Sequence, residues 1–296
     1  MTTDIKTALA EARALLQAKN IEHPRLEAEI LLAHVLNCSR ASLYARADLI
    51  LDPVQVQGYQ SCLDRRIEGI PTAYILGKKE FMGLDFKVSP AVLIPRPDTE
   101  LMVERAIHLA KQVQRPVMAD VGTGSGAIAI STAHFVPQLE VLAVDISPEA
   151  LELAQENAVT HRVKRRVKFL QSNLLEQLIK TRPPKSLDLI TANLPYIPSG
   201  DMAGLAKEVQ REPKLALDGG PDGLDLYRQL IPQARQLLKA GGHLLIEIGP
   251  GQGDGALALF EQPHWQAKLY RDLGDRERLV VAGLTGPARP PGPRNR

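Results

Sequence analysis

Apolar residues in the first part of the chain recur with the period of an α-helix. Between positions 5 and 16 they fall at every third or fourth place, which puts them on one face of a helix. Two further helices are predicted, one after Pro24 and one from about Pro53 to Ile70. Because this region has almost no β-branched alternation, the pattern predicts a small helical bundle over residues 1–76.

A β-hairpin is predicted immediately after the bundle. Apolar and polar residues alternate over 81–88 on either side of a glycine, as they do in two short paired strands. We therefore assign residues 77–99 to a hairpin linker. At its end, Asp98 or Thr99 can cap a helix that begins near Glu100.

From residue 100 onward, short apolar runs alternate with amphipathic stretches. This alternation of strands and helices predicts an α/β domain, with a doubly wound, mostly parallel sheet covered by helices on both faces. We expect the domain to span residues 100–285. The predicted strands are 117–121, 141–145, 167–170, 187–192 and 243–248, and the predicted helices are 127–134, 148–158 and 224–240, the last ended by Gly241 and Gly242.

Composition narrows the class of protein. Hydrophobic residues make up 44% of the 296 residues, which is ordinary for a folded protein, and no apolar stretch approaches the ~20 residues of a membrane span. The first residues carry no secretory signal and the chain has 2 cysteines, so we expect a cytoplasmic protein without a disulfide framework. Residues 286–296 are mainly Pro, Gly and Arg and are expected to be a disordered tail.

A glycine-rich loop follows the first predicted strand of the sheet and opens the next helix. Glycines permit a tight turn there and let a ligand approach the backbone closely. The loop is therefore a candidate binding site for the phosphate or nucleoside part of a cofactor. Its residues are Gly122, Thr123, Gly124, Ser125 and Gly126.

Acidic residues flank this loop. Asp145 ends the second strand, 19 residues after Gly126, where a carboxylate can accept hydrogen bonds from both ribose hydroxyls of a nucleoside. The loop also satisfies the dinucleotide pattern, so NAD stays open. The third glycine at 126 and Asp120, which can receive an ammonium group directly or through water, favour S-adenosylmethionine.

The most informative segment is Asn193-Leu194-Pro195-Tyr196, which follows the predicted strand 187–192. An Asn leaving a strand, followed by Pro and an aromatic residue, can present two oxygen acceptors and a flat ring where open α/β sheets hold their ligands. Two acceptors and a ring suit a planar NH2 group. By itself the segment leaves adenine and glutamine open as substrates.

Taken together, these segments resemble the release factor glutamine methyltransferases, the HemK/PrmC family. The tetrapeptide is similar to the (N/D)-P-P-(Y/F/W) motif of methyltransferases that modify planar nitrogens. The resemblance covers nearly the whole chain except the tail. The segments that carry it are Pro71–Gly77, Glu80-Phe81, Val92–Glu100, Asp120–Ala129, Asn193–Tyr196, Glu212-Pro213, Ala216–Gly220, Asp222–Leu224, Glu247–Gly249 and Gln252.

The resemblance implies a fold and an activity. The fold is that of class I S-adenosylmethionine-dependent methyltransferases, which is Rossmann-like. The activity is transfer of the methyl group of S-adenosyl-L-methionine to the side-chain amide nitrogen (N5) of the glutamine in the Gly-Gly-Gln loop of class I peptide chain release factors, in translation termination. S-Adenosyl-L-homocysteine is the product, no metal is required, the helical bundle docks the release factor, and a monomer is expected.

The resemblance also implies roles for individual residues. The Asn193 side-chain oxygen and the Leu194 backbone carbonyl accept the two amide N–H groups, next to Pro195, and Tyr196 lies against the amide plane. These bonds strengthen as the nitrogen becomes positive in the transition state. The cofactor contacts expected are the glycine loop with Asp120, Asp145, Asn173, Leu174 and Asn193.

The chain departs from the family pattern in three places. Leu194 stands where the family usually has proline, so the carbonyl is kept but the fixed φ is lost and an N–H is regained. Asn173-Leu174 stands where relatives often carry an acid and an aromatic residue. Asp98 stands where Glu is common. We expect altered cofactor contacts without loss of function.

Two alternatives to this function are kept. The first is methylation of a ribosomal-protein glutamine or of adenine N6 in nucleic acid. A nucleic-acid enzyme should show a target-recognition domain and a strong basic groove, and the formal net charge of +2 does not predict nucleic-acid binding. The second is a binding module or NAD-linked protein that holds a nucleoside without methyl transfer.

Overall fold

The structure is a computed structural model that describes residues 3–285 of the chain. The predicted disordered tail, 286–296, lies outside the described residues. The chain forms two compact units. The helical unit comprises the residues up to Lys78 together with Ala206–Arg211, and the sheet unit comprises Lys79–Leu205 and the residues from Glu212 onward.

The helical unit is the predicted bundle. Its apolar core includes Leu16, Leu31, Leu32 and Leu43, all with no exposed surface. Two of its helices are too short to show a clear helical period in the sequence and were not predicted. Its helices are α1 (Ile5–Ala18), α2 (Pro24–Val35), α3 (Arg40–Ala45), α4 (Pro53–Ile67) and α5 (Thr72–Leu76), and Val209–Arg211 adds the short 3-10 helix η3.

The units divide the chain differently from the predicted domains. The helical unit runs to Lys78 and not 76, and it takes in the distant segment Ala206–Arg211, for which the sequence pattern carries no signal. The hairpin of β1 (Lys78–Phe81) and β2 (Leu84–Lys87) is present as predicted. Residues 79–99 group with the sheet unit and do not form a separate linker.

The sheet unit is a doubly wound α/β fold with a mostly parallel sheet of seven strands, in the order β5-β4-β3-β6-β7-β9-β8. The first five strands in this order run parallel, and β9 and β8 add an antiparallel edge that the sequence analysis did not predict. The strands are β3 (Val117–Val121), β4 (Glu140–Asp145), β5 (Val167–Gln171), β6 (Leu187–Ala192), β7 (Leu238–Glu247), β8 (Trp265–Arg271) and β9 (Glu277–Leu284).

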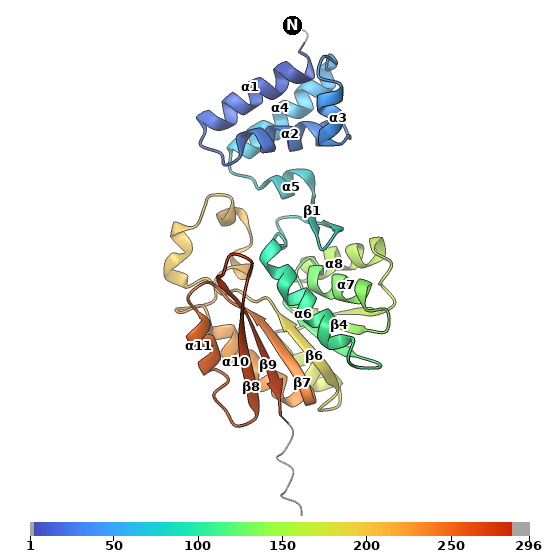
Figure 1. Cartoon of the computed structure of the whole chain (residues 1–296), viewed down its shortest axis with the longest axis vertical. Coiled ribbons are helices and arrows are strands. Elements are labelled where there is room, and N and C mark those ends of the chain that lie inside the picture. The colour runs from blue at the N-terminus through green and yellow to red at the C-terminus, as the bar shows by residue number, and fades with distance from the viewer. Residues whose placement is uncertain (1–2, 286–296) are drawn as a thin grey trace, which may run out of the picture. The chain divides into compact units, whose positions relative to one another are not determined.

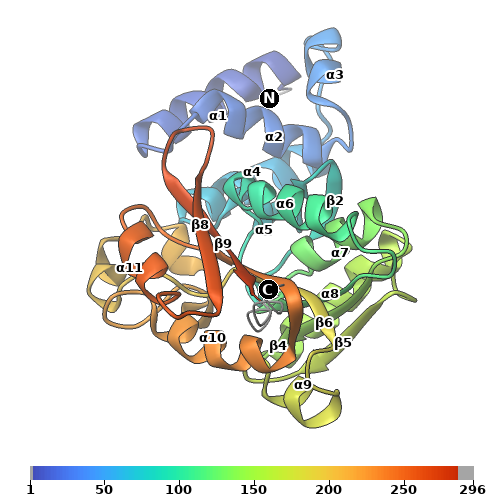
Figure 2. The same ribbon diagram turned by 60° about the horizontal axis from the view of Figure 1, so that its bottom comes forward.

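Helices cover both faces of this sheet because successive strand residues point to opposite sides. In β3, Met118 packs with one apolar cluster and Ala119 with the other. The first cluster includes residues of α6 (Glu100–Ala110), α7 (Ala127–Phe135) and α8 (Pro148–Thr160) (Figure 1). The second includes residues of α9 (Glu176–Thr181), α10 (Asp225–Leu237) and α11 (Gly253–Ala258) (Figure 2).

Short 3-10 helices are η1 (Pro97–Thr99), η2 (Ser199–Gly204) and η4 (Lys214–Ala216). Within residues 3–285, each helix is too short or too polar to cross a membrane.

One local prediction was wrong, and a second was correct only in part. The helix predicted over 224–240 ends at Leu237, because Leu238 already pairs with Leu187 of β6 and the strand bulges before the next paired residue, His243. The two glycines expected to end the helix lie inside β7. At the start of α6, Thr99 takes the N-cap position as predicted, but its side chain makes no capping hydrogen bond.

Asn157 of α8 fastens the hairpin to the glycine loop. Its amide oxygen accepts from the Lys87 backbone N–H at 2.8 Å, and its amide nitrogen lies 3.0 Å from the Lys87 carbonyl and 2.9 Å from the Ser125 carbonyl. The side chain is 1% exposed. One buried amide therefore joins three backbone groups from two segments that are far apart in the sequence.

We predict that Asn157→Ala lowers the free energy of unfolding of the sheet unit by about 2–3 kcal/mol, because a buried amide that loses its partners leaves backbone groups unsatisfied. Urea denaturation followed by the fluorescence of Trp265, the single tryptophan, measures this. The control is Glu156→Gln on the same helix, which breaks only an exposed ion pair with Lys87 and should change stability by about 0.5 kcal/mol or less. Equal stability of the two variants would contradict the assigned role.

Candidate active site

The loops that follow four parallel strands meet at one edge of the sheet. Val121 of β3 pairs with Val144 of β4 and with Ala192 of β6, and Asp145 pairs with Gln171 of β5. The carboxyl ends of these strands are therefore level. The chain order reverses between β3 and β6, and ligands of open α/β sheets bind outside such a reversal point.

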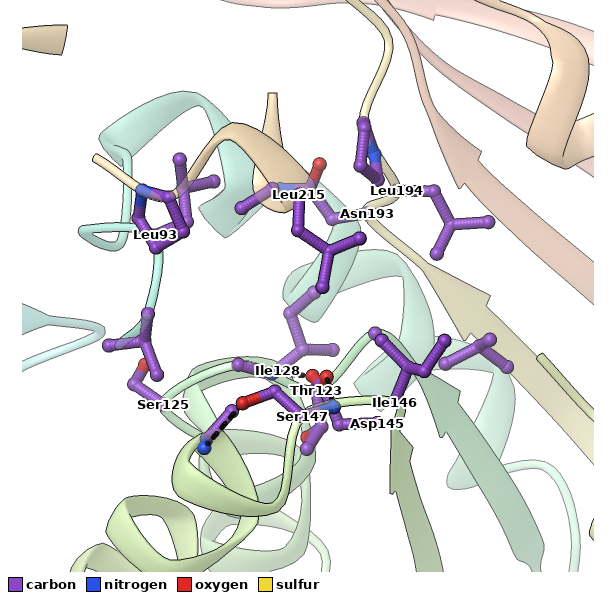
Figure 3. Close-up of a pocket in the computed structure, with 18 of the residues that line it drawn as sticks. Leu93, Thr123, Ser125, Ile128, Asp145, Ile146, Ser147, Asn193, Leu194 and Leu215 are labelled. Atoms are coloured by element: carbon purple, nitrogen blue, oxygen red, sulfur yellow. Dashed lines mark hydrogen bonds between the residues drawn. The ribbon is translucent and has the colours of Figure 1, made fainter. Parts of the chain in front are cut away.

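A cavity opens at this edge, bounded by those loops and by the segments around Leu93 and Leu215. In Figure 3, Asn193 and Leu194 lie across the cavity from Asp145, Ile146 and Ser147, and Leu215 projects into the space between them. Of the predicted site residues, the cavity is lined by Gly122, Thr123, Gly124, Ser125, Asp145, Asn173, Leu174, Asn193, Leu194 and Pro195, and Asp120, Gly126 and Tyr196 are not among the lining residues.

The glycine loop needs glycine at two places for close packing. Gly122 has φ +69°, and a Cβ there would lie 2.9 Å from the Leu194 side chain. Gly126 has φ +81°, and a Cβ there would lie 2.7 Å from Ile130. A side chain at either position is disfavoured both by the left-handed backbone and by the contact. The first contact also brings the two predicted motifs against each other.

Asp145 is held by the loop that it faces. One carboxylate oxygen accepts from the Gly124 backbone N–H at 2.8 Å, and the other accepts from the Ser147 N–H at 3.0 Å. Burial raises the pKa of Asp145, and these backbone hydrogen bonds oppose the rise. Each oxygen has a further lone pair to offer. A fixed pair of acceptors on the cavity wall suits two neighbouring hydroxyl groups.

Asp120 lies behind the loop and not on the cavity wall. It is 1% exposed and accepts hydrogen bonds from the Thr123 and Thr191 hydroxyls, each at 2.7 Å. Burial raises its pKa to about 6, against the effect of those two bonds. In this arrangement Asp120 links the glycine loop to β6. Because Asp120 does not line the cavity, it can receive the ammonium group of a cofactor only through water and not directly.

The loop after β5 supplies one polar and one apolar residue to the wall. The Asn173 side-chain nitrogen donates to Glu176 at 2.9 Å, which leaves its amide oxygen as the acceptor for a ligand. Leu174 is buried and lines the cavity beside it, with a positive φ of +48°. An apolar side chain there can cover a flat ring.

Asn193 and Leu194 both line the cavity. The Asn193 side-chain nitrogen donates to the Thr99 hydroxyl at 3.2 Å, so the amide oxygen is the group left for a ligand. The Leu194 N–H donates to the Tyr227 hydroxyl at 3.2 Å, and the Leu194 carbonyl lies 3.4 Å from the same hydroxyl. Tyr227 thus accepts the N–H that a proline at position 194 would lack.

Tyr196 is not among the residues that line the cavity. Its hydroxyl lies 3.5 Å from the Glu247 carboxylate, and burial raises its pKa to about 12. Its carbonyl accepts from the Gln252 side chain at 2.8 Å. The backbone of the tetrapeptide is therefore anchored, and the position of the Tyr196 ring against a substrate amide stays a prediction.

Several residues that shape the site were not predicted from the sequence. Glu212 accepts from the Ile94 backbone N–H at 3.0 Å and pairs with Arg96, so it joins two walls of the cavity. Thr99 and Tyr227 position the tetrapeptide from η1 and α10. The residues in each of these contacts are more than thirty positions apart in the sequence.

Within residues 3–285, no cluster of three or more His, Cys, Asp and Glu side chains is placed to hold a metal ion.

Two protein families match separate parts of the chain, and a solved structure shares its fold. The PrmC N-terminal domain model matches residues 7–77 and a methyltransferase domain model matches residues 114–264. The hMettl16 catalytic domain, solved in complex with MAT2A 3'UTR hairpin 6, has a TM-score of 0.55 and 15% identity and covers 81% of this chain and 86% of its own. That likeness shows the methyltransferase fold.

Proteins related in sequence identify the family more specifically than the likeness in fold does. A release factor glutamine methyltransferase of Moorella thermoacetica is 45% identical over 94% of this chain and 98% of its own length. Another, from Koribacter versatilis, is 42% identical over 94% of this chain and 97% of its own. At these identities and coverages, the chain belongs to the release factor glutamine methyltransferase family.

Proposed function

We propose that this protein transfers the methyl group of S-adenosyl-L-methionine to the side-chain amide nitrogen of the glutamine in the Gly-Gly-Gln loop of class I release factors. The observation that carries the proposal is that Asn193 and Leu194 line one cavity together with the glycine loop and Asp145. The relatives at 45% and 42% identity bear the same activity in their names. Their activity supports the substrate proposed here.

The residues of the cavity fit the methyl donor. Asp145 offers two fixed carboxylate oxygens for the ribose hydroxyls, and the glycine loop leaves open space beside Gly124, where a Cβ would meet nothing within 4 Å. Leu174 supplies an apolar surface and Asn173 an acceptor for the adenine. When bound, the donor supplies an activated sulfonium methyl group and becomes S-adenosyl-L-homocysteine.

The chain's own part in the reaction is to orient the amide. An amide nitrogen is a poor nucleophile because its lone pair is delocalised into the carbonyl. Acceptors that bond both N–H groups hold the nitrogen in place, and they bind more strongly as it becomes positive. We assign these roles to the Asn193 side-chain oxygen and the Leu194 carbonyl. Alignment of the two reacting groups supplies much of the remaining acceleration.

The helical unit is proposed to help dock the release factor. The support is that its residues 7–77 match the PrmC N-terminal domain model, which belongs to the same family as the relatives. A monomeric state and a cytoplasmic location remain part of the proposal.

The first prediction concerns the target residue. With tritiated S-adenosylmethionine and a purified class I release factor, we expect label on the wild-type factor and none on a factor whose Gly-Gly-Gln glutamine is replaced by alanine. Scintillation counting of the separated factor measures this. Label on the alanine factor would refute the target. An unlabelled wild-type factor, with label on ribosomal protein or on DNA instead, would favour the alternative substrates.

The second prediction separates the amide clamp from cofactor binding. Asn193→Ala should lower kcat by about 10²-fold or more, the loss typical of removing one group that stabilises the transition state, with little change in the Kd for S-adenosylhomocysteine. Asp145→Ala is the matched variant and should weaken that Kd by at least about tenfold, because two hydroxyl contacts are lost. Calorimetry and single-turnover kinetics measure both. Near-normal turnover in Asn193→Ala would contradict the clamp.

The third prediction concerns Leu194 in place of proline. Tyr227→Phe should lower the free energy of unfolding by about 1–3 kcal/mol, because the buried Leu194 N–H loses its acceptor. In a Leu194→Pro background the same substitution should cost less, because that N–H is absent. A double-mutant cycle by urea denaturation measures the coupling. Additive effects would show that Tyr227 does not compensate for the missing proline.

A further inference from the structure

A cluster of four charged residues joins the short helix η1 to the antiparallel edge of the sheet, and the proposed reaction gives this cluster no role. Its members are Asp98 of η1, Asp272 between β8 and β9, Arg276 just before β9 and Arg278 within it. The Arg278 guanidinium lies 3.1 Å from the Asp98 carboxylate and 3.6 Å from that of Asp272. The Arg276 guanidinium lies 3.6 Å from the Asp98 carboxylate and 3.1 Å from that of Asp272. Two positive and two negative charges therefore balance within one cluster.

Arg278 is the buried cation of this cluster. Its side chain is 6% exposed, and one of its terminal nitrogens donates to the Ile248 carbonyl at 3.3 Å. Its Nε atom has no hydrogen-bond partner among the residues that the structure describes. A buried charge is costly unless it is paired, and Arg278 lies closer to Asp98 than to Asp272. Because Arg278 is part of strand β9, its position is set by the sheet, and the ion pair holds Asp98 at that position.

Helix η1 depends on such contacts because it has few hydrogen bonds of its own. It is a single turn over Pro97–Thr99, in which the Thr99 N–H donates to the Arg96 carbonyl at 3.1 Å and no side chain caps the N-terminus. Short 3-10 helices have poor hydrogen-bond geometry and add little stability by themselves. We therefore expect the ion pair of Asp98 to contribute much of what fixes this turn.

The residue that follows Asp98 contacts the proposed acceptor Asn193. Thr99 is 4% exposed, and its hydroxyl oxygen accepts from the Asn193 side-chain nitrogen at 3.2 Å. This contact leaves the Asn193 amide oxygen for the substrate. If the amide turned by 180°, its NH2 group would face the substrate NH2 group, and two donors cannot bond each other. Movement of Thr99 away from Asn193 would therefore release the amide from the orientation that serves methyl transfer.

We propose that the ion pair of Asp98 with Arg278 is a positioning element of the reaction, which fixes η1 so that Thr99 holds the Asn193 amide oxygen toward the substrate. The inference rests on the proposed function and deepens it. Asp98 does not line the cavity, so the pair acts through Thr99 and not on the substrate. The proposal also gives a role to the antiparallel pair of β8 and β9, because β9 carries Arg278.

The first test compares two variants of Asp98 in the full-length protein. Asp98→Asn keeps the shape of the side chain and removes its charge. It should lower kcat for release-factor methylation by about 10- to 100-fold, the loss that misplacement of a reacting group can cause, while the Kd for S-adenosylhomocysteine changes by less than about twofold. Asp98→Glu restores a carboxylate and should keep at least half of the wild-type kcat.

The control for these variants is Asp275→Asn, in the segment that joins β8 to β9. The Asp275 side chain is 91% exposed and lies 3.9 Å from Arg271, so its loss should change kcat by less than about twofold. Near-normal kcat in Asp98→Asn, equal losses in Asp98→Asn and Asp98→Glu, or a loss only in cofactor affinity would overturn the inference.

The partner of Asp98 is tested in the same assay. Arg278→Gln should lower kcat to the same extent as Asp98→Asn, and the two substitutions together should cost less than about twofold more than either alone, because both break one ion pair. Losses that multiply in the double variant would show that the two residues act separately, which would overturn the inference.

A second double-mutant cycle gives a readout that general destabilisation would not give. In an Asn193→Ala background the ion pair has no amide left to orient, so Asp98→Asn should change the single-turnover rate by less than about twofold. A loss as large as in the wild-type background would show that Asp98 does not act through Asn193 and would overturn the inference. Absence of methylation by the wild-type protein would instead overturn the proposed function.

Discussion

The site depends on the parallel pairing of β3 with β6. Val121 lies opposite Ala192, so the glycine loop and the tetrapeptide leave the sheet side by side. The contact that would be made by a Cβ at Gly122 with Leu194 shows how closely the two segments pack. Because a shift of one residue would turn every side chain of a strand to the other face, this register is what brings the glycine loop and the tetrapeptide to one cavity.

Buried polar side chains then hold the loops that the pairing brings together. Asn157 fastens the glycine loop from α8, Glu212 joins two walls of the cavity, and Gln252 binds the Tyr196 carbonyl. Each bonds backbone groups that would otherwise be unsatisfied, and such bonds matter most where water is excluded. The cavity is therefore shaped by a few amides and carboxylates outside the reacting residues.

Much of the sheet could be predicted from sequence, and some of it could not. The bounds of β3 and β6 agree with the prediction to the residue, because buried parallel strands are continuous apolar runs. The end of α10 was missed because pairing of Leu238 with Leu187 overrides the local helical pattern. The edge strands β8 and β9 were not predicted. In the site, Asp145 and most of the predicted glycine loop line the cavity. Thr99 and Tyr227 contact the tetrapeptide from distant positions of the chain, so no local sequence pattern marks them.

The central claim is that the methyl donor and the glutamine amide meet between the glycine loop and the tetrapeptide. The most direct measurement is a crystal structure of the protein with S-adenosylhomocysteine and a peptide that contains the Gly-Gly-Gln sequence. We expect the glutamine side-chain nitrogen to lie within hydrogen-bond distance of both the Asn193 side-chain oxygen and the Leu194 carbonyl. We also expect this nitrogen to face the sulfur atom of the bound S-adenosylhomocysteine. A glutamine bound elsewhere, or one whose carbonyl oxygen faces Asn193, would contradict it.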